Sequence, residues 1–222
     1  MEEEKQKQSG VNDKKGTPTP VGKKHIIREY GESIIIAIIL ALVIRTFVVQ
    51  AFKIPSGSME DTLAIGDHIL VSKFIYGTKI PFIDKRILKI RDPRRGDVIV
   101  FEYPEDPSKD FIKRVIGTPG DEVEVKEKKV YVNGMPYENP HEVHKEKELI
   151  SREQNPRDNF GPVKVPENSY FVMGDNRDRS YDSRFWGFVK NPKIKGLAFI
   201  KYWSWDSARF RIRWGNIGRL ID

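Results

Sequence analysis

The stretch from Asp121 to Gly134, DEVEVKEKKVYVNG, decides the class of the fold. Valine and tyrosine alternate with charged residues in two short runs, and a period of two is typical of strands with one buried face. Asn133-Gly134 is a strong signal for a two-residue turn, because both residues readily adopt the positive φ angles that such a turn requires. The stretch together with the residues up to Tyr137 predicts two β-hairpins.

Similar runs recur on both sides of this stretch. They are rich in Val, Ile, Phe and Tyr and are bounded by Gly, Pro, Asp or Asn, which is the strand signature. The runs are DHILVSKFIYG (67–77), GDVIVFEYP (96–104), FIKRVIG (111–117), SYFVMGD (169–175), GLAFIKYWSW (196–205) and RFRIRWG (209–215). We expect a mainly β fold, with a twisted antiparallel β-sheet domain over residues 52–222. Within it, the charged, proline-containing segment 136–161 is expected to be a peripheral excursion.

A long apolar segment precedes these runs. It extends from Ser33 to Phe52, SIIIAIILALVIRTFVVQAF, and a helix of this length spans about 30 Å, the thickness of a bilayer's hydrocarbon layer. Arg45 lies toward one end, where its side chain can reach the lipid head groups. We predict one transmembrane helix over residues 30–50. The alternatives are a buried core helix and a signal peptide cleaved near Val49-Gln50-Ala51.

The segment before the apolar stretch indicates the orientation. Residues 1–28 are polar and lack periodicity, which predicts a disordered tail. Lys23, Lys24 and Arg28 lie next to the apolar segment, so the positive-inside rule places this tail in the cytoplasm and residues 52–222 outside it. The tail is also far longer than the first region of a signal peptide, which favours an uncleaved anchor.

Composition sets outer limits on function. The chain has 222 residues, a net charge of +7 and no cysteine. Disulfides, thiolate catalysis and zinc sites built on cysteine are therefore excluded. A basic balance favours nucleic acid or an anionic membrane surface as a partner, without distinguishing between them.

The segment after the apolar stretch, KIPSGSM (53–59), contains a candidate nucleophile. Gly57 allows a sharp turn and close approach to a substrate, and a serine on such a turn can present its hydroxyl beside backbone N–H groups that face an oxyanion. Taken alone, Ser-Gly-Ser is more typical of an ordinary polar loop. The sequence therefore has to supply a base before Ser56 or Ser58 becomes a catalytic candidate.

Histidine is the usual base, but no pattern points to one. His25 lies in the tail and His68 in a predicted strand, while His141 and His144 lie in the charged excursion, where HEVH is one residue short of a zinc-protease motif. Lysine serves as a base only when burial lowers its pKa toward neutrality. The best candidate is Lys113, which has apolar neighbours on its strand; the alternative is a half-exposed strand with two solvated cations.

A second polar segment, MGDNRDRSYDSRFWG (173–187), is dense in aspartate and arginine. Asp182 and Arg184 are two residues apart and can form a pair that stiffens a site, and Ser180 can bond to a lysine amine. The calcium-loop spacing of glycine and a closing glutamate is missing. A solvated charged loop is the alternative.

In this order, the segments resemble bacterial signal peptidase I, the membrane-bound Ser/Lys endoprotease that removes signal peptides from exported proteins. The resemblance rests on a transmembrane segment followed by IPSGSMEDTLAIGDHILVSKFIYG, RRGDVIVF, FIKRVIGTPGD and MGDNRDRSYDSRFWGFV, and it covers roughly residues 30–205. Glu60 and Asp61 depart from the neutral residue and proline of many members. Arg179 and Tyr181 replace small or polar residues around Ser180.

The resemblance implies a role for each matching residue. Ser58 corresponds to the nucleophile and Lys113 to the general base, which act through an acyl-enzyme intermediate. The Ser56 hydroxyl and the Ser58 backbone N–H correspond to the oxyanion hole. Ser180 corresponds to the serine that holds the lysine, with Asp182 and Arg184 as a supporting pair. No metal or cofactor is implied.

The resemblance also implies a substrate, partners and a location. The substrates are signal peptides of secreted preproteins, cut after small-x-small sites, and an added substrate strand would present alternate side chains to two shallow pockets. The strand edges expected to pair with it are residues 52–57, with Phe52, Ile54 and Pro55, and residues 110–112, with Asp110 and Ile112. The partners are these peptides and the lipid bilayer, not nucleic acid. The location is the bacterial cytoplasmic (inner) membrane, crossed once.

Two other classes of protein remain as alternatives. A membrane-anchored basic binding module predicts salt-sensitive binding without hydrolysis. A soluble, self-cleaving Ser/Lys repressor-type protease predicts no anchor, and membrane fractionation would detect it.

Overall fold

The computed structural model describes residues 23–80, 83–87 and 89–222 and divides the chain into two compact units at Ala41 and Leu42. The first unit contains most of helix α1 (Lys23–Val43), which continues into a π-helical turn, Ile44–Val48. The stretch Tyr30–Val48 is long and apolar enough to cross a membrane, and none of it is buried within the protein. This exposure does not support the alternative of a buried core helix. Of the expected tail, residues 1–22 lie outside the described residues, and α1 begins at Lys23.

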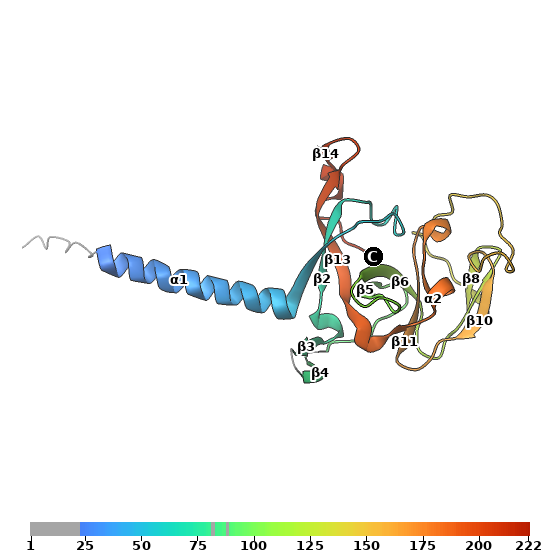
Figure 1. The fold of residues 1–222 in the computed structure, drawn as a ribbon, viewed down its shortest axis with the longest axis horizontal. Coiled ribbons are helices and arrows are strands. Elements are labelled where there is room, and N and C mark those ends of the chain that lie inside the picture. The colour runs from blue at the N-terminus through green and yellow to red at the C-terminus, as the bar shows by residue number, and fades with distance from the viewer. Residues whose placement is uncertain (1–22, 81–82, 88) are drawn as a thin grey trace, which may run out of the picture. The chain divides into compact units, whose positions relative to one another are not determined.

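In the second unit, most of the described strands form one large antiparallel sheet (Figure 1). Its order is β1-β2-β13-β5-β6-β11-β12, and β14 pairs with the C-terminal end of β13. The bounds are Val49–Lys53 (β1), Asp67–Ser72 (β2), Val98–Glu102 (β5), Asp110–Gly117 (β6), Ser169–Met173 (β11), Val189–Lys190 (β12), Ile194–Asp206 (β13) and Arg211–Ile212 (β14). The mainly β, antiparallel prediction is confirmed.

The stretch DEVEVKEKKVYVNG (121–134) contributes β7 and β8 to a smaller sheet of order β10-β7-β8-β9, which lies beyond β11 in Figure 1. Its strands are Glu122–Lys126 (β7), Lys129–Val132 (β8), Met135–Pro136 (β9) and Phe160–Lys164 (β10). Glu127 and Lys128 join β7 to β8, and Asn133 and Gly134 join β8 to β9, all with positive φ. Both predicted hairpins are thus confirmed. A separate hairpin pairs β3 (Thr78–Ile80) with β4 (Ile83–Ile87).

Strand β6 is held by three clusters of buried apolar side chains. Ile112 packs against the first cluster, which contains Ile54, Met59 and Leu63. Val115 belongs to the second and Ile116 to the third, where the smaller sheet packs. Because side chains on both faces of β6 are packed, its backbone has a fixed position in the unit. The polar residues of β6 are fixed with it.

Two segments differ from the pattern expected of them. The run 209–214 is not a continuous alternating strand: only Arg211 and Ile212 pair with β13, and Phe210 adopts a φ of 49° and is exposed. Its basic and apolar residues alternate, but Arg209 and Phe210 lie in a turn and Trp214 begins a 3₁₀ helix, so the alternation does not continue as a pleated strand. The segment 136–161 has little regular structure, yet it is tied to the polar segment 173–187 by a bridge between Val143 and Asn176.

Candidate active site

The Ser56-Gly57-Ser58 turn directly follows β1 and is anchored on both sides. Ile54 continues the pairing with β2, since its N–H donates to Asp67 O at 2.8 Å and its carbonyl accepts from Gly66 N at 3.0 Å. After the turn, Met59 and Leu63 are fully buried, and Leu63 N donates to Met59 O. Asp61 adopts a φ of 79°, which the ring of a proline forbids, so the departure from proline at this position matches the backbone.

Asn176 and Gly174, from the polar segment 173–187, hold the turn from the other side. The backbone N–H of Asn176 donates to Ser58 O at 3.2 Å, and its Nδ2 donates to Gly57 O at 3.0 Å. Gly174 lies so close that a Cβ atom built on it would collide with Ser58 O. These contacts occupy the carbonyls of Gly57 and Ser58, and they require glycine at position 174.

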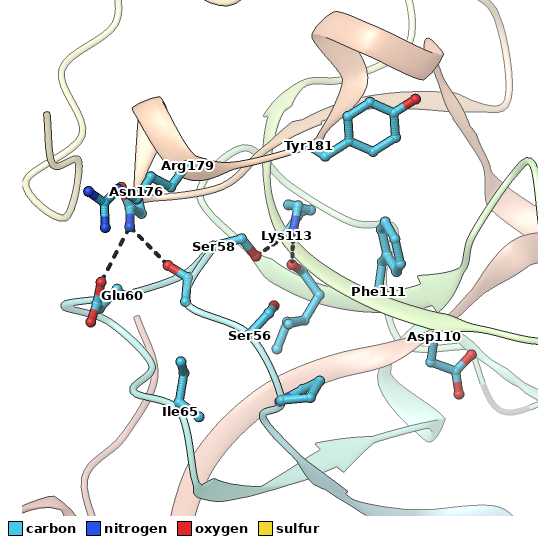
Figure 2. A pocket seen from close by; sticks show the side chains of 13 residues that line it. Ser56, Ser58, Glu60, Ile65, Asp110, Phe111, Lys113, Asn176, Arg179 and Tyr181 are labelled. Carbon is cyan, nitrogen blue, oxygen red and sulfur yellow. Dashed lines mark hydrogen bonds between the residues drawn. The ribbon is translucent and has the colours of Figure 1, made fainter. Parts of the chain in front are cut away.

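Lys113 on β6 meets this turn. Its Nζ is 2.7 Å from Ser58 Oγ and 3.1 Å from Ile112 O, and the amine lies over the Phe111 ring, 5.5 Å from its centroid (Figure 2). Lys113 is only 4% exposed and Ser58 8%. Burial lowers the pKa of Lys113 to about 8, because the charged form loses its hydration; the Asp182 carboxylate opposes that shift, and Arg184 adds to it. The alternative of a half-exposed strand with solvated cations is therefore wrong.

Arg114, the next residue on β6, lies in a different environment. Its Nε and Nη2 each donate to a carboxylate oxygen of Asp175 at 2.8 Å, and both side chains are almost fully buried. Asp175 also accepts from Thr62 Oγ1 at 2.6 Å and from Asn139 Nδ2 at 3.1 Å. The bidentate pair neutralises the two buried charges. Through Asp175 it links β6 to the polar segment 173–187, and through the bond from Thr62 to the residues that follow the Ser56-Gly57-Ser58 turn.

Asp182 and Arg184 form the predicted pair. Arg184 Nε and Nη2 donate to the two oxygens of Asp182 at 2.8 Å, and Arg184 also donates to the carbonyls of Arg157 and Arg177 at 2.7 Å. Burial would raise the pKa of Asp182, but Arg184 outweighs it and holds that pKa below its usual value. Asp182 also accepts from Gly174 N and caps helix α2 (Ser183–Trp186), so the pair fixes the backbone next to Ser58.

Ser180 and Ser56 have weaker links to Ser58 and Lys113. Ser180 Oγ is buried, and among the described residues no partner meets it with full hydrogen-bond geometry, although it is near enough to the Asp182 carboxylate to help lower that pKa. A contact between Ser180 and the lysine amine therefore remains a prediction. Ser56 is exposed and lines the same pocket as Ser58 and Lys113, which leaves its hydroxyl free to face a substrate.

The pocket lies between two free strand edges and has a volume of about 590 Å³. Strand β1 ends the large sheet. Residues 110–112 of β6 pair with β5 on one side, whereas the pairing with β11 involves only residues 114–117. In the part of the chain that the structure describes, no strand covers the other side of 110–112. The apolar walls include Pro55, Phe111 and Ile112.

Comparison of the sequence with known proteins places the chain in a family. A sequence model described as signal peptidase, peptidase S26, matches residues 27–203. The chain belongs to the peptidase S26 family of signal peptidases. It is 41% identical over 223 residues to a signal peptidase I of Pseudomonas fluorescens and 42% identical over 218 residues to one of Pseudomonas aeruginosa; each alignment covers 85% of this chain and 77% of the relative.

Two other organisms contribute matches. A probable signal peptidase I-2 of Synechocystis is 43% identical over 181 residues, with 79% of this chain and 72% of the relative covered. A solved signal peptidase I structure from Enterococcus faecalis aligns at 35% identity with a TM-score of 0.39, covering 48% of this chain and 97% of that chain. Membership of the family makes this protein a serine peptidase, a hydrolase.

Other residues around the pocket were not singled out by the sequence pattern. Asn176, Gly174 and the Arg114–Asp175 pair all contact the segments that carry Ser58 or Lys113. The excursion contributes as well, since Lys145 Nζ lies 2.5 Å from Glu60 Oε2. The density of charged residues in 173–187 was a usable sequence signal for Gly174, Asp175 and Asn176, which lie in that segment. No sequence signal joined Lys145 to Glu60, which are 85 residues apart.

The histidines of the excursion have a different environment from a metal site. His144 Nε2 lies 3.6 Å from Glu142 Oε1, and its Nδ1 lies 3.5 Å from Asp178 Oδ1. In the described ranges, no group of three or more His, Asp or Glu side chains is arranged to hold a metal ion. His144 of the HEVH sequence thus contacts one carboxylate of the excursion and one of the polar segment 173–187.

Proposed function

We propose that this protein is a membrane-anchored serine endopeptidase that removes N-terminal signal peptides from exported preproteins through a Ser58–Lys113 dyad. The observation that carries the proposal is the 2.7 Å separation of Lys113 Nζ and Ser58 Oγ in a buried setting. A nucleophile within hydrogen-bond reach of its base, with the base's pKa near the working pH, is the arrangement that general-base catalysis needs.

The reaction runs in two halves. Neutral Lys113 accepts the Ser58 hydroxyl proton while Ser58 Oγ attacks the carbonyl carbon of the scissile bond. The resulting oxyanion is held by the Ser58 N–H and the Ser56 hydroxyl. Collapse breaks the C–N bond, the protonated Lys113 gives its proton to the leaving amine, and an acyl ester stays on Ser58. Lys113 then takes a proton from water, which attacks the ester. The acyl–oxygen bond breaks, Lys113 returns this proton to Ser58 Oγ, and the signal peptide leaves with a free carboxylate.

Burial is what makes the lysine a base. An ordinary lysine has a pKa near 10.5, whereas in Lys113 burial lowers the pKa to about 8. At pH 7 to 8 a useful fraction of the amine is therefore neutral. The contact with Ile112 O and the Asp182–Arg184 pair, which fixes the neighbouring backbone, support the position of the amine.

The two free edges support the proposed mode of substrate binding. A substrate strand between residues 52–57 and 110–112 would satisfy backbone groups that have no strand partner in the described chain. Its alternate side chains would face the same wall, and the shallow walls near Pro55 and Ile112 suit small residues at the first and third positions before the cut.

The apolar helix supports anchoring in the bacterial cytoplasmic membrane. Tyr30–Val48 has the length of a single span, and Lys23, Lys24 and Arg28 precede it. The positive-inside rule then gives a cytoplasmic N-terminus and an extracytoplasmic catalytic domain, where exported preproteins arrive. Membrane fractionation, with protease treatment of intact and permeabilised spheroplasts, tests this orientation.

The dyad is tested by preprotein cleavage with the purified full chain. Ser58→Ala and Lys113→Ala are each expected to reduce kcat/KM by about 10⁴-fold or more, because the two groups act as one unit. Ser151→Ala and Lys129→Ala make the same changes at exposed positions outside the pocket and should leave cleavage unchanged. Near-normal turnover by either dyad variant would refute the mechanism.

A further inference from the structure

The direction of a bound substrate follows from the two free edges. Residues 52–58 run toward Ser58, and residues 110–113 run toward Lys113, so both edges end at the dyad. In a cleavage that leaves the acyl half on Ser58, the residues before the cut occupy the space between the edges. They run parallel to both edges, and the leaving half must continue past the dyad.

The pocket has walls on that far side. Figure 2 shows Glu60, Asn176 and Arg179 together on one side of the Ser58–Lys113 contact, with Asp110 and Phe111 on the other. Glu60 follows the nucleophile by two residues, and Arg179 ends the 3₁₀ turn Arg177–Arg179 that follows Asn176. The first residues of the mature protein would therefore emerge between these side chains.

The cations at this end differ in how tightly their partners hold them. Glu60 is already neutralised, since Lys145 Nζ lies 2.5 Å from its Oε2 and Asn176 Nδ2 donates to the same oxygen at 3.4 Å. The Asp178 carboxylate is buried and pairs with Lys128. Arg157 has a bidentate partner in Asp158, whereas the Arg179 side chain is 64% exposed and its Nε approaches the Glu146 carboxylate only to 3.9 Å. Arg179 is therefore the most exposed and most loosely paired cation of this cluster, and it lines the pocket.

We propose that Arg179 is a specificity residue of the leaving-group side, which favours an acidic side chain within the first two residues of the mature protein. A planar guanidinium matches a carboxylate in two parallel hydrogen bonds. Successive residues of an extended chain point to opposite faces, so the preference belongs to one of the two positions. The inference rests on the proposed Ser58–Lys113 mechanism and on the substrate direction that it sets.

The test uses one preprotein with Asp, Asn or Lys at the first or the second mature position, cleaved by full-length protein in a non-ionic detergent. With the native protein, kcat/KM should fall in the order Asp, Asn, Lys, by about 5-fold overall at one position, the size of a partly exposed ion pair. Arg179→Gln should flatten this order and Arg179→Glu should reverse it. The order should weaken at high salt, because the contact is exposed.

Lys190→Glu is the matched control. It makes the same change of charge at an exposed position on β12, outside the pocket, and should keep the native order. A native order that survives Arg179→Glu would overturn the proposal. So would an equal loss on all substrates, which would mean that Arg179 only supports the turn. An order that appears only with anionic lipid vesicles would assign Arg179 to lipid head groups instead.

The two proposals fail in different ways. If Ser58→Ala still cleaves the Asn substrate, the Ser58–Lys113 mechanism is wrong, whatever the order of kcat/KM among the Asp, Asn and Lys substrates. If Ser58→Ala is inactive and the native protein cleaves all substrates equally, only the inference about Arg179 is wrong.

Discussion

Lys113 and Arg114 are neighbours on β6 and both are buried, but only Arg114 has a carboxylate partner among the described residues. Arg114 has a bidentate partner in Asp175, and further donors complete the hydrogen bonding of that carboxylate. Lys113 contacts a hydroxyl and a carbonyl, and none of the described carboxylates lies within ion-pair distance of it. The comparison shows how adjacent cations separate into a structural charge and a titratable base: the difference lies in the partner, since burial is common to both.

The largest effect is expected when both positions carry the same side chain. Lys113→Arg puts a permanently charged guanidinium beside Ser58, which cannot accept its proton. We expect kcat/KM to fall by about 10³-fold or more, within or above the range for loss of a general base. Lys109→Arg makes the same substitution in the exposed turn before β6, so it is the matched control and should retain activity. Substantial cleavage by Lys113→Arg would contradict a role for this residue as the base.

The second prediction concerns Asp175 and the loss of its partner Arg114. Arg114→Met leaves the Asp175 carboxylate buried without its counter-charge, and the free energy of unfolding should fall by about 3–5 kcal/mol. Chemical denaturation measures this loss. Adding Asp175→Asn should recover part of it by removing the orphaned charge. A loss of less than about 1 kcal/mol would mean that the pair is not buried as described.

The third prediction is that replacing Lys113, unlike replacing Arg114, raises the free energy of unfolding. Because burial lowers the pKa of Lys113 to about 8, the unfolded chain binds this proton more tightly and the charged amine destabilises the fold at pH 7. Lys113→Met should therefore raise the free energy of unfolding, by up to about 3 kcal/mol at pH 7. The gain should shrink as the pH rises from 8 toward 10.5. A destabilised Lys113→Met protein would contradict this account.

The same titration predicts the pH dependence of cleavage. Catalysis needs neutral Lys113, so kcat/KM should rise with pH and level off above an apparent pKa of about 8, falling about tenfold per pH unit below it. Steady-state assays from about pH 5.5 to 9.5 measure the profile on both sides of that pKa. A flat profile below pH 8 would be incompatible with a neutral lysine base.

The smallest expected effect belongs to Asn176, which connects the polar segment 173–187 to the Ser56-Gly57-Ser58 turn. Asn176→Ala removes the Nδ2 bond to Gly57 O but keeps the backbone bond to Ser58 O. We expect kcat to fall by about 10-fold, the equivalent of one hydrogen bond, with little change in KM. Asn176→Asp keeps the size but loses the donor, so it should be equally impaired. Recovery in Asn176→Asp would point to a packing role.

The strands were accessible from the sequence because their signal is local. Alternation around Val123 and Val125 and the Asn133-Gly134 turn fixed the hairpins, and a period of two survives whatever the strand packs against. The run 209–214 shows the limit of this signal. Its alternation is equally regular, but Phe210 lies in a turn, since only two of its residues find a partner strand.

The β class, the apolar span and the residue types of a Ser/Lys site are evident in the sequence. Ser58 and Lys113 were identified because their segments resemble a family, while spacing alone left Lys113 open between base and solvated cation. The tertiary structure excludes the solvated cation, because Lys113 is buried. Fifty-five residues separate Ser58 and Lys113 along the chain, and packing against the core sets their 2.7 Å contact, the burial that lowers the pKa of the lysine, and the position of Arg179 in the pocket wall.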